Sequence, residues 1–151
     1  MDQGIKIRLY KKCHEIVADK IRDIELAISE AQDAANQETK STAGDKHDTA
    51  RAMMQLEVEQ KSRQLAEAKK LKQALASFDP TSGQHKIEQG SLIITETANY
   101  YISIGLGKLE VDRELYFAIS PLSPIAQAVM HKKNSTYFEW NGKKIEIKRF
   151  F

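Results

Sequence analysis

The chain has 151 residues, of which 41% are apolar and 29% are charged, so we expect one folded domain or two small ones rather than a disordered chain. The formal net charge of +2 is too small to indicate nucleic-acid binding by itself, and the single cysteine, Cys13, excludes an internal disulfide framework. No apolar run has the length of a signal-peptide core or a membrane span, which predicts a soluble, cytoplasmic protein without a membrane partner.

The first half of the chain has the composition of two long helices. Residues 9–78 contain no proline and one glycine, Gly44. On both sides of this glycine, apolar residues follow steps of four and three, the heptad pattern of packed helices. The first seam is Val17, Ile21, Ile24, Ile28, Ala31 and Ala35, and the second is Met54, Val58, Leu65, Ala68 and Leu75, with Lys61 and Lys72 between. The short connection predicts an antiparallel coiled-coil hairpin over residues 1–78, with an acidic tip near residues 44–48.

Each predicted helix has about 27–30 residues, which corresponds to about 40–45 Å. A hairpin this long and narrow has no globular core of its own, so we expect its tip to project far from the rest of the protein.

The helical pattern ends at "SFDPTSGQ", where Pro80 and Gly83 predict a linker over residues 79–84. A two-residue period follows, which is typical of strands. The predicted strands are residues 91–95, 99–104, 114–119, 136–140 and 143–151. Asn141-Gly142, between the last two strands, predicts a tight turn with positive φ at both positions.

One helix is predicted among these strands, in "SPIAQAVMHKK". Ser123 is suited to the N-cap, and Pro124 to the first helical position. Lys132 and Lys133 would lie at the C-terminal end, where the helix dipole favours positive charge. Together these elements predict an α+β domain over residues 85–151, in which one helix packs across a small antiparallel sheet.

Two carboxylates, Asp45 and Asp48, lie three residues apart where the second long helix is expected to begin, in "AGDKHD". Capping is one explanation, because an aspartate at the N-cap and another at the third position resemble a capping box. Magnesium binding is the other, because Mg²⁺ keeps several waters and needs only one or two protein oxygens. A tip could supply those oxygens to a metal that a partner already holds. His47, between the two acids, is assigned no ligand role.

No motif indicates a self-sufficient enzyme. The sequence has neither a phosphate-binding glycine loop nor a nucleophile elbow. Cys13 has no evident partner for nucleophilic catalysis, since the adjacent His14 would project from a different helical face.

The whole pattern resembles the Gre family of bacterial transcript-cleavage factors. At the tip, "GDKHD" is similar to the family's Gly-Asp-x-x-Glu signature, which aligns Asp45 and Asp48 with its two acids. In the second half, "SPIAQAVMHKK" is similar to the family's Ser-Pro-x-Ala-x-Ala segment, and "TYFEWNGKKIEIKRF" to its closing hairpin. The resemblance covers nearly the whole chain.

The resemblance implies a transcription elongation factor that binds the secondary channel of RNA polymerase as a monomer. Its C-terminal domain would have an FKBP-like fold and dock through Ser123 and Pro124. Asp45 and Asp48 would help to hold an Mg²⁺ ion supplied by the polymerase, with no cofactor of the factor's own. The polymerase would then cleave a backtracked transcript near the nascent RNA 3′ end, by two-metal chemistry.

The chain departs from the family at both motifs. Asp48 stands where the family usually has glutamate, so its carboxylate reaches about 1.3–1.5 Å less far. Leu122 stands where family members often carry aspartate or asparagine. A regulator that occupies the channel without promoting cleavage is therefore the alternative function.

Two further alternatives belong to other classes of protein. A prolyl isomerase would follow from the fold of residues 79–151 alone, although a fold does not carry an activity with it. A scaffold whose hairpin dimerises would not require Asp45 and Asp48 for its function.

Overall fold

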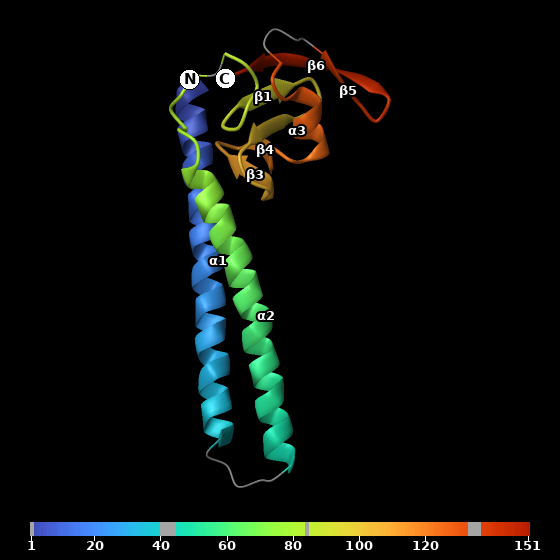
Figure 1. The fold of residues 1–151 in the computed structure, drawn as a ribbon. Helices are drawn as coiled ribbons and strands as arrows, with labels where there is room; N and C mark the ends of the chain where they lie inside the picture. Colours follow the sequence, from blue (N-terminus) through green and yellow to red (C-terminus); the bar gives the residue numbers. More distant parts are fainter. Residues whose placement is uncertain (1, 40–44, 84, 133–136) are drawn as a thin grey trace. The chain divides into compact units, whose positions relative to one another are not determined.

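A computed structural model describes residues 2–39, 45–83, 85–132 and 137–151 (Figure 1). The chain divides into two compact units. One unit contains Met1–Glu15 and Gln73–Phe151, and the other is Ile16–Lys72. Two long helices, α1 (Asp2–Thr39) and α2 (Asp45–Ala76), contribute to both units. We call the first the sheet unit and the second the helix-pair unit.

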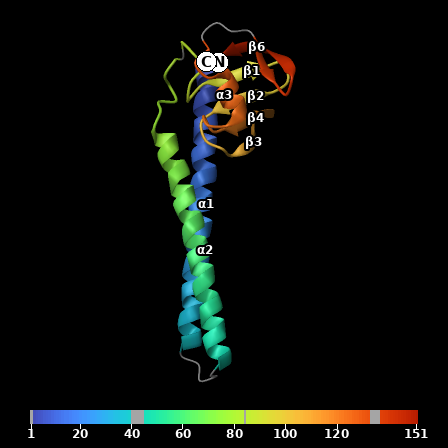
Figure 2. The ribbon, with the colours of Figure 1, turned by 45° about the vertical axis from the view of Figure 1, so that its right-hand side comes forward.

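The helix-pair unit consists of residues 16–39 of α1 and residues 45–72 of α2, which lie side by side and run in opposite directions (Figures 1 and 2). The predicted seams are confirmed: Val17, Ile24, Ala31 and Ala68 are buried, and the other apolar members within this unit are half-buried. Lys61 is half-buried, whereas Lys72 is exposed. The pattern of burial is therefore coiled-coil-like.

Both helices are longer than predicted, with 38 and 32 residues. The difference is greatest at the start of α1, which begins at Asp2 and includes Gly4. A glycine inside a helix costs only about 1 kcal/mol relative to alanine. Lys6 and Leu9 are fully buried in the sheet unit, and this tertiary packing holds the first turns.

The sheet unit contains a six-stranded open sheet in the order β3-β4-β2-β1-β6-β5. The strands are β1 (Leu92–Thr95), β2 (Asn99–Ile102), β3 (Gly107–Val111), β4 (Glu114–Ile119), β5 (Tyr137–Trp140) and β6 (Lys143–Phe150). Neighbouring strands are antiparallel except β2 and β4, which are parallel. The α+β class is as predicted, and the sheet is mostly rather than wholly antiparallel.

The parallel pair follows from a strand that the sequence analysis missed. β3 pairs with β4 from Gly107–Ala118 to Val111–Glu114, so the chain reverses direction between them. The turn is made by Asp112 and Arg113, whose φ angles are 54° and 67°. Such two-residue turns usually contain glycine or asparagine, and this one has neither residue at its two central positions. Because β3 intervenes, β4 returns beside β2 in the same direction.

The short helix α3 (Pro124–Val129) begins as predicted and ends early. The Ser123 side chain accepts a hydrogen bond from the Ala126 N–H at 3.3 Å, which confirms the N-cap. His131 has a φ of 67°, a conformation that no helix continues, so Lys132 does not lie in a last helical turn. Lys133 lies outside the described residues. The turn predicted at Asn141-Gly142 is confirmed by φ angles of 52° and 73°.

The two faces of the sheet are covered differently. On one face, α3 packs against an apolar core formed by Ile87, Ile93, Ile102, Ala126, Val129, Phe138, Ile145 and Ile147. The other face packs against the first turns of α1 and the residues that follow α2. There the ring of Phe78 contacts that of Tyr101 at 6.4 Å between centroids, and Arg8 forms an ion pair with Asp112.

Candidate functional site

The predicted acidic tip is described in part. The backbone of Asp45 is the first residue of α2, but its side chain lies outside the described residues, and so do residues 40–44. Asp48 lies in the first turn of α2 and is exposed. A carboxylate in this position is favoured by the positive end of the helix dipole, and it remains available to a cation.

The described residues do not form a metal site of their own. Among residues 2–39, 45–83, 85–132 and 137–151, no group of three or more histidine, cysteine, aspartate or glutamate side chains is placed to hold a metal. One exposed carboxylate such as Asp48 supplies one or two oxygens, whereas Mg²⁺ requires six ligands. A metal bound at Asp48 would therefore need most of its ligands from elsewhere.

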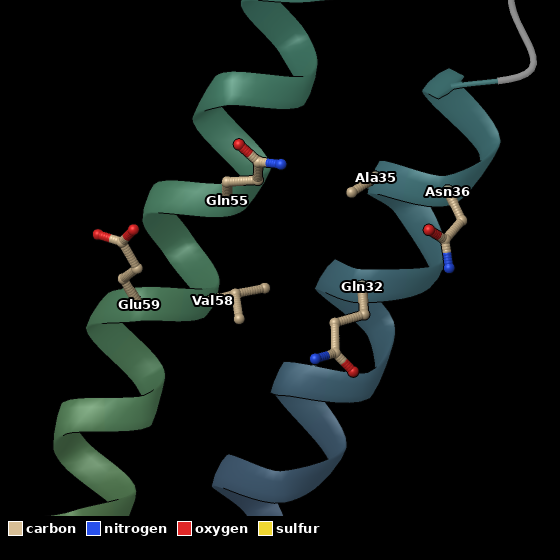
Figure 3. Close-up of a pocket in the computed structure, with 6 residues that line it drawn as sticks. All are labelled: Gln32, Ala35, Asn36, Gln55, Val58 and Glu59. Carbon is tan, nitrogen blue, oxygen red and sulfur yellow. The ribbon is translucent and has the colours of Figure 1, made fainter.

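An open depression of ≈ 530 Å³ lies between α1 and α2 in the helix-pair unit (Figure 3). In the close-up, the side chains of Ala35 and Val58 point toward one another across the gap, whereas Glu59 points away from α1. The remaining lining residues are amides, Gln32, Asn36 and Gln55. Amides can form hydrogen bonds but cannot act as nucleophiles or as general acids or bases near neutral pH. The depression marks a thin part of the apolar seam, lined mainly by amide side chains.

The predicted docking residues lie in the loop that enters α3. Ser123 is half-buried because its hydroxyl caps the helix, and its N–H donates to the Ser120 carbonyl at 3.0 Å. Pro124 is exposed, and Leu122 exposes 84% of its surface. Leu122 and Pro124 are therefore exposed, while the hydrogen bonds of Ser123 hold the start of α3.

A buried polar cluster that no sequence pattern predicted lies under α1 in the sheet unit. Cys13 from α1, Tyr101 from β2 and Ser103 just beyond β2 are all buried. Neither the Tyr101 hydroxyl nor the Ser103 hydroxyl has a hydrogen-bond partner of good geometry among the described residues. The Tyr10 hydroxyl donates a hydrogen bond to the Leu75 carbonyl at 2.9 Å. It lies close enough to Tyr101 to contribute to the raised pKa of that residue.

Burial governs the acidity of this cluster. It raises the pKa of the Cys13 thiol to about 11, and the nearby Ser103 hydroxyl offsets only part of that rise. It also raises the pKa of Tyr101, with smaller contributions from Cys13 and Tyr10. Since the thiolate is the reactive form of cysteine, Cys13 is unsuited to nucleophilic catalysis at neutral pH.

A second buried polar group, Lys6, lies on the same helix. Its side chain is fully buried, and its ammonium donates a hydrogen bond to the Ser82 carbonyl at 3.1 Å. Burial lowers the pKa of Lys6, and the charge of Asp79 opposes that shift in part. Sequence spacing offered a signal for this burial: Lys6, Leu9 and Cys13 step by three and four along one helical face.

Comparisons with models of protein families, with curated proteins and with solved structures found no match. In the part of the chain that the structure describes, no helix combines the length and the hydropathy that a membrane span requires.

The predicted site residues fall in two places: Asp48, with the backbone of Asp45, belongs to the helix-pair unit, and Ser123 and Pro124 belong to the sheet unit.

Proposed function

We propose that the protein is a Gre-type transcription elongation factor. It binds in the secondary channel of RNA polymerase as a monomer and promotes Mg²⁺-dependent cleavage of backtracked RNA by the polymerase's own active site. In this role it is an accessory factor without a cofactor of its own. The sheet unit, with its mostly antiparallel sheet and short helix, would be an FKBP-like domain that docks through the Ser123-Pro124 loop.

The observation that carries this proposal is the exposed Asp48 at the start of α2, in a unit built from two helices alone. A pair of helices gives Asp48 no surrounding cage, and the described residues supply no complete metal site. An acid in this position suits a metal centre that another macromolecule owns.

The Mg²⁺ chemistry itself would belong to the polymerase. Where two metal ions catalyse RNA cleavage, one activates the attacking water and the other stabilises the leaving oxygen. The contribution of Asp45 and Asp48 would be to add negative charge and oxygen ligands at a fixed position, which is electrostatic and positional catalysis.

The test is RNA cleavage in stalled elongation complexes supplied with Mg²⁺. The native protein should release short fragments that end at the RNA 3′ terminus. The double variant Asp45→Asn with Asp48→Asn should bind as well as the native protein but lose at least about 100-fold in cleavage rate, as for the loss of an electrostatic catalytic group. The matched control is Asp23→Asn with Asp33→Asn, which makes the same charge change at exposed sites on α1. Equal loss in both double variants would contradict a specific role for the tip.

A non-cleaving channel regulator is the second candidate, because residue 48 is an aspartate, whose side chain is shorter than that of the glutamate usual in the Gre family. In that case the native protein would bind the polymerase and alter transcription without shortening the RNA. The variant Asp48→Glu separates the two functions. If cleavage appears only in Asp48→Glu, the native protein is a regulator; if the native protein already cleaves, it is an elongation factor.

A further inference from the structure

Leu122 is the most exposed large apolar residue in the described part of the chain. It exposes 84% of its surface, whereas Leu26, Met53 and Leu56 each expose about 60%. It lies in the loop between β4 and α3, next to the half-buried Pro121. When a partner covers a leucine this exposed, the free energy of the complex falls in proportion to the apolar area removed from water.

Hydrogen bonds on both sides of Leu122 restrain the backbone of the loop. The Leu122 N–H donates to the Ser120 hydroxyl at 3.1 Å, and the next N–H, that of Ser123, donates to the Ser120 carbonyl at 3.0 Å. On the other side, the Gln127 side chain donates to the Pro121 carbonyl at 2.6 Å. Because proline also fixes its own φ angle, little backbone freedom is left for a partner to remove. A preorganised anchor of this kind loses little entropy on binding.

The segment of chain that carries Leu122 is uncharged. No aspartate, glutamate, lysine or arginine occurs from Leu115 to Met130, in a chain of which 29% is charged. Neither a phosphate backbone nor an anionic membrane surface would find a positive group in this segment. Apolar contact with hydrogen bonds at the rim, as at the centre of a protein interface, is the chemistry that fits.

We propose that Leu122 is the central anchor of the docking contact and inserts into an apolar socket on the protein partner. The inference rests on the proposed function, in which that partner is RNA polymerase. The docking contact would then be apolar at its centre, whereas Gre family members often carry a polar aspartate or asparagine at the position of Leu122. The socket must then be apolar as well, so the factor should prefer polymerases whose docking surface carries an uncharged pocket.

The experiment measures equilibrium binding of the full chain to core RNA polymerase at about 0.1 M and 0.5 M salt. The native affinity should change by less than about threefold between the two, because exposed charge pairs are screened whereas apolar contacts are not. Leu122→Asp should weaken binding by about 30-fold or more, and Leu122→Met by less than about threefold. The control is Leu115→Asp, at a leucine that exposes 48% of its surface on β4, and it should bind like the native protein.

Three results would overturn the inference. Native-like binding by Leu122→Asp would leave the proposed function intact but remove Leu122 as its anchor. Concentration-dependent self-association that Leu122→Asp abolishes would show that a second copy of the chain covers the loop. Failure of the native protein to bind polymerase at all would remove both proposals together. Unfolding curves of each variant check that weaker binding reflects the contact rather than the fold.

Discussion

The two faces of the sheet are built from different kinds of residue. On the face that packs against α3, the buried side chains are apolar, with Ile93, Ile102 and Phe138 at the centre. On the opposite face, the first turns of α1 bring Lys6 and Cys13 into the interior, next to strand residues that include Tyr101. We call the first the apolar face. We call the second the polar face, because it buries these polar groups beside apolar residues such as Leu9 and Leu92.

This difference indicates which contacts supply the stability of the sheet unit. Apolar burial is favourable wherever it occurs, whereas a buried polar group costs free energy unless it is hydrogen-bonded. Tyr101 buries a hydroxyl without a hydrogen-bond partner among the described residues, and the buried Ser103 hydroxyl has only the Cys13 thiol nearby. We therefore expect α3 and its core to hold the unit together, and the first turns of α1 to open at lower cost.

The largest effect should come from the apolar face. Ile102→Ala removes a fully buried side chain between β2 and α3 and should lower the free energy of unfolding by about 2–5 kcal/mol. Urea unfolding at pH 7 measures it. Leu115→Ala, at a partly exposed site on β4, is the control and should cost less than about 1 kcal/mol. A cost below about 1 kcal/mol for Ile102→Ala would mean that the α3 core is not the main source of stability.

On the polar face, Lys6→Met should stabilise the protein by about 1–2 kcal/mol at neutral pH. The substitution keeps the buried stem and removes a charge that one hydrogen bond to the Ser82 carbonyl and the opposite charge of Asp79 compensate only in part. Lys11→Met, on the exposed side of the same helix, should change the free energy of unfolding by less than about 0.5 kcal/mol. Destabilisation by Lys6→Met would show that the buried ammonium is well compensated.

The gain from Lys6→Met should also depend on pH. The pKa of Lys6 is lowered in the folded state below its ordinary value of 10.5, so between these two values the unfolded chain binds more protons. Native stability therefore rises with pH in this window, and below it the penalty is fully present. The advantage of the methionine variant should be largest at neutral pH and shrink toward pH 10.5. Urea unfolding of both proteins at pH 7 and pH 10 tests the sign.

Tyr101→Phe removes one hydroxyl from the polar face and should raise the free energy of unfolding by about 1 kcal/mol. The ring contact with Phe78 is retained, and the buried oxygen without a partner is lost. Tyr100→Phe is the matched control on the neighbouring residue, whose hydroxyl is close enough to the Thr97 side chain for that side chain to lower its pKa. That variant should lower stability by a similar amount, so the two changes should have opposite signs. The same sign in both would refute the assignment of Tyr101 as unpaired.

Sequence patterns described best the features that local residues encode. Heptad spacing located the helix-pair seams, strand periodicity located five of six strands, and Ser123 and Asn141-Gly142 were recognised from local chemistry. These features depend on residues near one another in the chain. β3 was missed because its turn uses Asp112 and Arg113 at positive φ, where glycine or asparagine is the usual signal.

The polar face could be derived only in part, because the spacing of Lys6, Leu9 and Cys13 places them on one helical face but does not show that this face is buried. A lysine in a charged helix is normally solvated, and only the tertiary packing of the first turns of α1 buries Lys6. Tyr101 has the alternation of a strand residue, but nothing local reveals that its hydroxyl lacks a partner. In the candidate site, the cap by Ser123 was predicted from local chemistry, whereas the 84% exposure of Leu122 depends on the path of the whole loop.

The smallest expected effect comes from the ion pair at the edge of the polar face. Arg8 on α1 donates to Asp112, in the turn between β3 and β4, at 2.7 Å, and both side chains are about half exposed. Solvent screens such a pair, so the double-mutant cycle of Arg8→Gln and Asp112→Asn should give a coupling of about 0.2–1 kcal/mol that falls further at 0.5 M salt. The cycle of Lys70→Gln and Glu67→Gln, on an exposed pair within α2, provides a local reference. A coupling well above 1 kcal/mol would show that a surface charge pair, rather than burial of Leu9 and its neighbours, fastens α1 to the sheet.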